Sequence, residues 1–308
     1  MKSVVLTGGV GGAKFVLGLK ACGLGGDITA IVNTGDDFRH LGLHVSPDID
    51  TLLYTLSGKD NKAQGWGREG ETWSFLDAMR SLGGPDWFRL GDGDLALHVL
   101  RSERLARGHR LSEIVADFAR AWEVGITMLP MSDALVATMV DTDQGELEFQ
   151  RYFVERQCKP AVKRVRFEGA DAAKAAPGVV EAIAAADAVF VAPSNPYLSI
   201  DPILGVAEIA AALRATNAPV IAISPLVGGT AVKGPTAKIM QELGVRADNN
   251  AIAAHYAPII DAMLHDVSDA PPQGLPSRAT RTLMRDLADK SRVATEAIAL
   301  ARQLAAGA

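Results

Sequence analysis

The chain has 308 residues, of which 48% are hydrophobic, and its formal net charge is −5. This composition is sufficient for a large buried core, in one large α/β domain or two smaller ones. No block of Lys or Arg stands out, so the sequence does not indicate a nucleic-acid-binding surface. Cys22 and Cys158 are too few for a disulfide framework, which favours reduced thiols in a cytoplasmic protein. No apolar stretch approaches the roughly 18 residues of a membrane span.

Short apolar runs that favour strands alternate with helical patterns along most of the chain. After the first strand-like run, the pattern predicts a helix from about Ala13 to Cys22. Alternating strands and helices favour an α/β fold of the Rossmann-like class, with a doubly wound, mostly parallel sheet. The strand-like runs span residues 3–9, 28–37, 187–196 and 218–229.

The middle of the chain departs from this alternation. It predicts two successive helices and then an antiparallel pair of strands, at 94–108, 111–125, 134–142 and 145–153. We expect an insertion subdomain, approximately residues 60–160, within a single Rossmann-like domain that spans 1–308. The tail, which is rich in Ala, Leu and Arg, predicts a helix over about 278–304.

Polar residues follow each strand-like run directly, in the sequences TGG, NTGDD, PSNP and SPLVGG. In a parallel sheet the carboxyl ends of the strands lie along one edge, and ligands bind in the crevice there. Polar loops also end strands in proteins that bind nothing. The repeated form nevertheless favours a binding site at which segments far apart in the sequence converge.

Residues 7–15 (TGGVGGAKF) join the first strand to the first helix. Glycines at such a turn let backbone N–H groups approach a phosphate, and a helix N-terminus favours negative charge. The loop matches neither a Walker A motif nor a dinucleotide fingerprint. It has more glycines than a tight turn requires, which favours phosphate binding, and Lys14 could add a charge. The glycines are Gly8, Gly9, Gly11 and Gly12.

Four aspartates lie within fifteen residues between the second strand-like run and a helical run: Asp36, Asp37, Asp48 and Asp50. Ser46 and the proline after it predict a helix N-cap, which places Asp48 in the first turn, where the helix dipole favours an acid. That explanation does not cover Asp37. Asp37 and Asp50 could together hold Mg²⁺ across the crevice, since Mg²⁺ takes one or two carboxylates plus substrate phosphates. The spacing alone leaves both explanations open.

Other polar and aromatic residues have ordinary structural explanations. Asp94 could cap the helix that follows it, and Arg89 could bind a phosphate. His98 is expected to be an ordinary helix residue, and Ser132 with Asp133 a turn. The three tryptophans of this region are expected in the core, with stacking on a flat ligand as the less favoured role; they are Trp66, Trp73 and Trp87.

Two loops near the end of the sheet suit recognition. PSNP places Ser194 and Asn195 between two prolines, which stiffen the loop. SPLVGG ends in two glycines that could approach a ligand closely. The chain has no Ser-His-Asp order, CxxC pair or HExxH motif, so covalent catalysis is not indicated.

Taken in order, these motifs resemble the 2-phospho-L-lactate transferase family of coenzyme F-420 biosynthesis. The resemblance extends from the first strand to the last helix. Together the motifs are specific, although each alone is weak. They are GGVGGAK (8–14), NTGDD (33–37), SPDIDTLLYTLSG (46–58), WGRE-x-x-TW (66–73), LGDGDLALH (90–98), LPMSD (129–133), APSNP (192–196) and SPLVGG (224–229).

The resemblance implies a Mg²⁺-dependent reaction. A guanosine diphosphate joined to a three-carbon acid meets the deazaflavin Fo, the terminal ribityl hydroxyl attacks the phosphorus nearer the acid, and GMP leaves. The acid could derive from phosphoenolpyruvate, 2-phospholactate or 3-phosphoglycerate. A glycine cradle and a carboxylate-held metal suit phosphoryl transfer, which relies mainly on positioning and charge neutralisation. Family habit also implies a homodimer, with small-molecule substrates and no nucleic acid or membrane partner.

The resemblance carries roles to particular residues. Asp50 and Arg89 are expected at the deazaflavin, and Asp50 is the best candidate for a catalytic carboxylate. Asp37 and Asp50 are expected at the metal. The guanosine diphosphate is expected among the residues of three loops, namely Gly8, Gly9, Gly11, Gly12, Ser194 and Asn195.

Two other classes of protein are alternatives. One is a regulatory protein of the same fold that binds a nucleotide sugar, which resembles GGGTG at the first loop rather than GGVGGAK. The other is an NAD-dependent dehydrogenase, which is disfavoured by Lys14 and by Asn33, where an acid would end the second strand.

Overall fold

A seven-stranded parallel sheet forms the centre of the molecule, in the order β14-β13-β10-β9-β1-β2-β5. The computed structural model describes residues 1–24, 27–232 and 234–307. The chain first builds the sheet outward from β1 to β5 and then returns to β9 on the other side of β1. The switch point of this doubly wound sheet therefore lies between β1 and β9. The strands are β1 (Ser3–Thr7), β2 (Ile28–Val32), β5 (Thr127–Pro130), β9 (Ala188–Val191), β10 (Val220–Ile223), β13 (Ala262–Asp266) and β14 (Ser277–Thr280).

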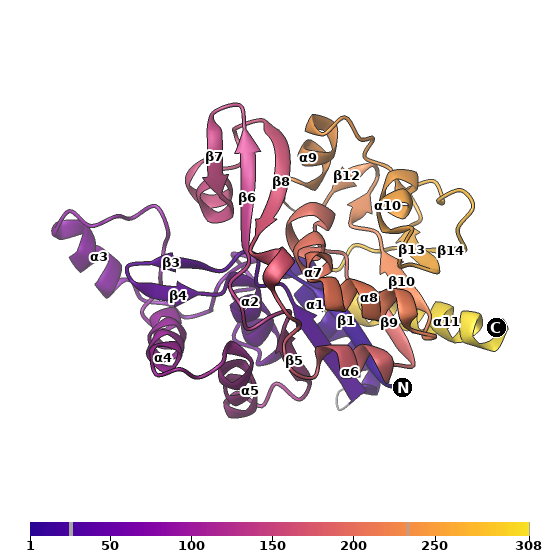
Figure 1. Cartoon of the computed structure of the whole chain (residues 1–308), viewed down its shortest axis with the longest axis horizontal. Helices are drawn as coiled ribbons and strands as arrows, with labels where there is room; N and C mark the ends of the chain where they lie inside the picture. Colours follow the sequence, from indigo (N-terminus) through magenta and orange to yellow (C-terminus); the bar gives the residue numbers. More distant parts are fainter. Residues whose placement is uncertain (25–26, 233, 308) are drawn as a thin grey trace.

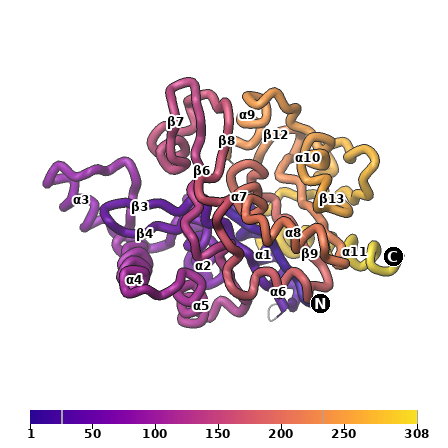
Figure 2. The backbone as a smooth tube through the Cα atoms, in the orientation of Figure 1, coloured from indigo at the N-terminus to yellow at the C-terminus, as the bar shows by residue number. Residues whose placement is uncertain are grey.

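Helices cover both faces of this sheet (Figures 1 and 2). Along β1, Val5 packs into one hydrophobic cluster, whereas Val4 and Leu6 pack into another on the opposite face. Burial on both faces explains why the central strands are continuous apolar runs. The first cluster includes residues of α1 (Gly9–Leu19), α2 (Pro47–Leu56), α5 (Leu111–Ala121) and α11 (Leu287–Gly307), and the second includes residues of α6 (Val179–Ala184), α7 (Asp201–Gly205), α8 (Ala207–Ala215) and α10 (Asn249–Tyr256).

The inserted elements form two groups, because β5 belongs to the central sheet although it falls within residues 60–160. Between β2 and β5 the chain adds a hairpin, β3 (Phe38–His40) with β4 (Leu43–Val45), and the helices α3 (Ser74–Ser81) and α4 (Asp94–Ala106). After β5 comes an antiparallel sheet of β6 (Ala137–Thr142), β7 (Gly145–Glu148) and β8 (Val162–Glu168). In Figure 1, α3 extends away from the body of the molecule. Two short strands and a helix follow β10, namely β11 (Leu226–Val227), β12 (Thr230–Ala231) and α9 (Thr236–Glu242).

The register of the sheet places three loops side by side. Thr7, the last residue of β1, pairs with Val32 of β2, and Leu6 pairs with Val191 of β9. The loops after β1, β2 and β9 thus leave the same edge at nearly the same level. The backbone N–H of Asn33 donates to the carbonyl of Thr7 at 2.9 Å, which extends the pairing into the loops.

Most predicted elements are confirmed, including the parallel sheet and the antiparallel β6–β7 pair. The first helix begins at Gly9, earlier than predicted. The predicted tail helix is wrong at its start, since Ser277–Thr280 forms β14 on β13 and α11 begins only at Leu287.

The tryptophan prediction is also wrong. Trp66 is 46% exposed, and Trp73 and Trp87 are only partly buried. All three lie in the insertion rather than in a central cluster.

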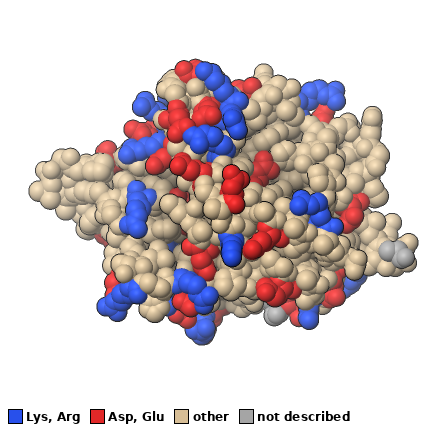
Figure 3. Space-filling model, in the orientation of Figure 1, with Lys and Arg blue, Asp and Glu red and all other residues tan. Residues whose placement is uncertain are grey.

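Acidic and basic side chains are interspersed on the face drawn in Figure 3, which agrees with the absence of a basic block in the sequence. The lobe that carries α3 is largely free of charge in this view. Among the helices that the structure describes, none is both long enough and apolar enough to cross a membrane.

Candidate active site

The glycine loop and the PSNP loop meet at the switch point. The backbone N–H of Gly8 donates to Ser194 Oγ at 3.2 Å, and this hydroxyl donates to the Gly8 carbonyl at 2.7 Å. These residues are 186 positions apart in the sequence. The predicted convergence of the strand-end loops is therefore confirmed at this point.

Close packing explains most of the loop's glycines. A Cβ atom on Gly11 would lie 2.6 Å from the Pro193 carbonyl oxygen, and one on Gly12 would lie 2.7 Å from Ser194 Oγ. A Cβ on Gly8 would lie 2.5 Å from Asp48 Oδ2. Gly9 differs, because it has open space around it and a φ of +62° that favours glycine. Three of the four glycines thus let protein segments approach one another, and their predicted role at a nucleotide stays a prediction.

Asp48 holds the glycine loop to the loop after β2. Its Oδ1 accepts from the Gly9 N–H at 2.7 Å, and its Oδ2 accepts from Asn33 Nδ2 at 3.0 Å. Asn33 Oδ1 in turn accepts from the Gly35 N–H at 2.8 Å. Burial raises the pKa of Asp48 to about 6, and the hydrogen bonds from Asn33 and Gly9 oppose this rise. Asp48 is therefore an organiser of the loops as well as a first-turn acid.

Asp37 lies beside the start of α2 and is buried. Its Oδ2 accepts from Ser46 Oγ at 2.7 Å and lies 2.9 Å from His44 Nε2. Ser46 occupies the predicted N-cap position, but its hydroxyl bonds Asp37 instead of capping the helix. Asp37 Oδ1 and Asp36 Oδ1 are buried without a hydrogen-bond partner. Burial, together with the Asp48 charge, raises the pKa of Asp36 well above its usual range.

Asp50 is held by a guanidinium group from α4. Arg101 Nη1 donates to Asp50 Oδ2 at 3.2 Å, and Arg101 Nη2 donates to Asp50 Oδ1. Asp50 is 4% exposed and Arg101 is 0% exposed, so this is a buried ion pair. Burial raises the pKa of the Asp50 carboxyl, and the charge of Arg101 opposes that rise. Sequence analysis did not identify Arg101.

His98 lies between two carboxylates in the same network. Its Nδ1 is 3.6 Å from Asp50 Oδ2, and its Nε2 is 3.3 Å from Asp94 Oδ2. Asp94 also accepts from the hydroxyl of Tyr54 on α2. Asp94 is the first residue of α4 and does not cap it, contrary to that interpretation of the sequence. His98 is buried against Asp50 and Asp94, whereas the sequence predicted an ordinary helix residue.

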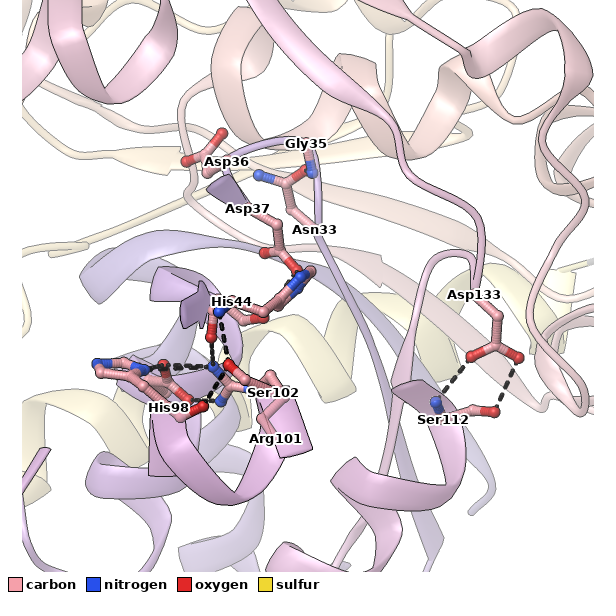
Figure 4. Close-up of polar contacts among 12 residues, drawn as sticks. Asn33, Gly35, Asp36, Asp37, His44, His98, Arg101, Ser102, Ser112 and Asp133 are labelled. Carbon is pink, nitrogen blue, oxygen red and sulfur yellow. Dashed lines mark hydrogen bonds and ion pairs between the residues drawn. The ribbon is translucent and has the colours of Figure 1, made fainter. Parts of the chain in front are cut away.

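His44 connects Asp37 to Arg101, the partner of Asp50, and Figure 4 shows His44 between Asp37 and Arg101. Its ring bonds Asp37, and its carbonyl accepts from Arg101 Nη1 at 3.3 Å. Its backbone N–H donates to Ser102 Oγ at 2.7 Å. One residue of the β3–β4 hairpin therefore fixes the relative positions of both groups.

Arg89 lies on the long segment between α2 and α4, away from these contacts. It is exposed, and its guanidinium stacks on the ring of Trp73 at 4.2 Å from the ring centroid. Asp92 accepts from the backbone N–H groups of Ser74 and Phe75, both at 3.0 Å, and so fixes the start of α3. The deazaflavin role of Arg89 stays a prediction.

Two polar loops have structural functions. The N–H groups of Gly228 and Gly229 donate to the Asp269 carboxylate at 3.0 and 2.6 Å, so a side chain already binds them. Asp133 accepts from the N–H of Ser112 at 2.7 Å and fixes the start of α5, consistent with the turn interpretation. Asn195 differs. Its Oδ1 caps the turn that follows, but its Nδ2 is buried without a partner and can still donate.

The structure thus brings together the glycine loop, Ser194, Asp37 and Asp50 around the start of α2. Sequence reasoning missed Arg101, His44 and Tyr54. One signal was present, because Asp94, His98 and Arg101 recur at helical spacing in the α4 sequence and form a polar stripe on one face.

Fold and site together define a doubly wound α/β protein with a carboxylate-rich cluster beside the switch point. Comparison with known proteins then identifies the family. The sequence profile of 2-phospho-L-lactate transferase CofD matches residues 4–303. The chain belongs to this family of transferases, which acts in coenzyme F-420 biosynthesis.

Curated relatives cover the whole chain. A phosphoenolpyruvate transferase of Kitasatospora aureofaciens is 43% identical over 100% of both chains. A protein of the same name from Mycolicibacterium smegmatis is 39% identical over 93% of this chain and 94% of the other. Among solved structures, a UPF0052 family protein from Bacillus halodurans has a TM-score of 0.64 at 18% identity and covers 96% of this chain and 98% of the other. The last match supports the fold alone.

Proposed function

We propose that this protein transfers a phospho-three-carbon-acid group from a guanosine diphosphate-activated donor to the ribityl hydroxyl of Fo. The hydroxyl oxygen forms a bond to the phosphorus nearer the acid, the bond from that phosphorus to the GMP oxygen breaks, and the hydroxyl proton is released. The full-length family match, together with the meeting of Asp37, Asp50 and the glycine loop at one sheet edge, carries the proposal. No match favours the nucleotide-sugar-binding alternative.

We propose phosphoenolpyruvyl as the transferred group. The supporting observation is the shared name of the curated relatives, each a phosphoenolpyruvate transferase at about 40% identity. The 2-phospholactyl donor is the closest competitor, because it differs only in saturation and one stereocentre. A comparison of the two donors at equal concentration, with GMP release as the readout, distinguishes them.

Mg²⁺ is part of the proposal, and its fit to the site differs between the two predicted carboxylates. Asp37 Oδ1 is buried and has no partner, as a ligand oxygen that lacks its cation would be. Both oxygens of Asp50 instead accept from Arg101. Among the described residues, Asp50, Asp94 and His98 bring potential ligand atoms within 4.8 Å of one another, but Arg101 already occupies both oxygens of Asp50. We therefore place the hard cation at Asp37. The ion would neutralise the donor's phosphates.

Transfer also requires the reacting groups to be oriented and kept from water. Asp50 would accept the hydroxyl hydrogen of Fo, since each carboxylate oxygen has a second lone pair. Asn195 Nδ2 would donate to the guanosine diphosphate. The homodimer and the cytoplasmic location stay predictions.

The proposed function is tested with purified protein, Fo, Mg²⁺ and each guanylylated acid. Release of GMP together with a deazaflavin product of the expected mass supports it. Absence of product with every donor, under conditions in which the protein is folded, overturns it.

A further inference from the structure

Arg101 is a fully buried arginine whose terminal nitrogen atoms are used within the Asp50 network. Both bond Asp50, and Nη1 also donates to the carbonyl of His44. Arg101 lies one helical turn after His98 on α4, whereas Asp50 is on α2. This contact therefore joins two helices through one buried ion pair.

Stability alone does not explain a buried ion pair of this kind. Removing a carboxylate and a guanidinium from water costs free energy that their attraction often fails to repay. Packed apolar residues at the two positions would often hold the helices together equally well. The pair therefore points to a requirement for an ionised carboxylate in a fixed orientation.

The neighbours of the pair hold the elements that carry it in place. Ser102 Oγ donates to the His98 carbonyl at 2.6 Å and accepts from the His44 N–H, which ties α4 to β4 (Figure 4). The guanidinium spans both oxygens of Asp50, in the paired geometry that only Arg provides. Asp50 Oδ1 keeps a lone pair for a further donor, whereas Oδ2 also lies 3.6 Å from His98 Nδ1.

We propose that Arg101 is a positioning residue for the transfer reaction. It fixes the Asp50 carboxylate for the acceptor's primary hydroxyl and supplies at that carboxylate the positive charge that a metal ion would otherwise supply. This inference rests on the proposed function and adds to it which positive group neutralises which carboxylate. The cation belongs at Asp37, and the guanidinium belongs at Asp50.

The direct test compares Arg101→Lys with Arg104→Lys, a control one turn further along the same helix, where Arg104 pairs with Asp117 at 2.7 Å. Lysine keeps the charge but cannot span both oxygens of Asp50. We expect kcat of Arg101→Lys to fall about 100-fold, as for a misplaced reacting group, with KM for the guanosine donor unchanged. Arg104→Lys should keep wild-type kinetics.

Chemical rescue separates positioning from a purely structural role. Guanidinium ions at concentrations that do not denature the protein should restore part of the kcat of Arg101→Ala and should not change Arg104→Ala. Wild-type kcat in Arg101→Lys overturns the proposal. So does a loss of activity that is accompanied by unfolding, seen by circular dichroism, and that guanidinium does not rescue.

Two binding measurements complete the test without relying on turnover. Mn²⁺ binding, followed by electron paramagnetic resonance, should persist in Asp50→Asn and be lost in Asp37→Asn, and the reverse result overturns this assignment of positive groups to carboxylates. Fo binding, followed by its fluorescence, should weaken about tenfold in Arg101→Lys, as expected for a displaced hydrogen bond to a charged group. Wild-type protein that binds Fo but releases no GMP overturns the proposed reaction. The role of Arg101 is then decided by whether Arg101→Lys binds Fo more weakly than the wild type does. Protein that does not bind Fo overturns both.

Discussion

Asp48 and Asp50 lie two residues apart on α2 but are stabilised in different ways. Neutral donors hold Asp48, namely a backbone N–H and the Asn33 amide, and they connect two loops at the switch point. A buried guanidinium holds Asp50 and connects α2 to α4. The first arrangement organises the backbone around the crevice, whereas the second keeps a charged carboxylate in a fixed orientation.

Within one short helix, Asp48 therefore holds the shape of the loops, whereas Asp50 is placed for the reaction. The donors to Asp48 belong to two loops, so both of its oxygens are engaged in holding those loops together. An ion pair whose carboxylate keeps free lone pairs can receive a donor from the substrate. We therefore expect substitutions at Asp48 to lower stability chiefly and substitutions at Asp50 to lower activity chiefly.

The largest expected effect is that of Asp50→Asn on transfer. The amide keeps one acceptor oxygen for Arg101, so the fold should persist, but the carboxylate that receives the acceptor's hydroxyl is lost. We expect kcat/KM for GMP release to fall at least about 100-fold. The matched control is Asp77→Asn on exposed α3, which should keep wild-type activity. Full activity in Asp50→Asn would remove this residue from the mechanism.

Asp48→Ala tests the other half of the comparison. It leaves the part-buried Gly9 N–H without its acceptor and removes one of the two acceptors of Asn33 Nδ2, which keeps the Leu198 carbonyl at 3.3 Å. We expect the free energy of unfolding to fall by about 1–3 kcal/mol, as for one donor left unpaired and a second hydrogen bond lost. Urea titration of this variant and of Asp77→Ala measures the difference. An Asp48→Ala protein as stable as the wild type would show that the loops hold together without this carboxylate.

Glycine substitutions sharpen the account of the first loop. Gly11→Ala would place a methyl group 2.6 Å from the Pro193 carbonyl oxygen and should cost about 1–3 kcal/mol through forced separation of the loops. Gly9→Ala has open space and suffers only from its positive φ, which costs about 1–2 kcal/mol. If Gly9 approaches a phosphate, Gly9→Ala should weaken donor binding more than its stability cost explains. Donor affinity by calorimetry, beside urea midpoints, decides this.

The smallest effect concerns Asp266, a second carboxylate held by neutral donors. Burial tends to raise the pKa of Asp266, but hydrogen bonds from Ser268 and Thr282 outweigh this and lower it. A lowered folded-state pKa contributes stability above the unfolded value, near pH 4, that is lost as the pH falls through the folded value. The difference in urea midpoint between wild type and Asp266→Asn should therefore shrink as the pH falls below about 4. A difference that grows on acidification would contradict the assigned direction.

Much of the fold follows from sequence patterns that act locally. Strands buried on both faces have continuous apolar runs, and the loops that follow them are polar, so the parallel sheet and its binding edge were predictable. The end of the chain was not. Ser277–Thr280 is too short and has too little apolar character for its sequence to predict a strand. This strand, β14, is defined by its pairing with β13.

The site was predictable only in part, and for a physical reason. Asp37, Asp50 and Ser194 follow strands or begin a helix, so topology places them at one edge. Arg101 reaches Asp50 from α4, whose position against β4 and α5 is set by tertiary contacts. A polar stripe on α4 was visible in the sequence, but nothing in it identifies the carboxylate that it meets.

The measurement that tests the central claim most directly is an assay of purified protein with Fo, Mg²⁺ and the guanylylated phosphoenolpyruvyl donor. GMP release is followed over time, and the deazaflavin product is identified by mass. The account predicts equal amounts of GMP and of Fo that carries the phosphoenolpyruvyl group. Folded protein that binds Fo and the donor but yields neither product would contradict it.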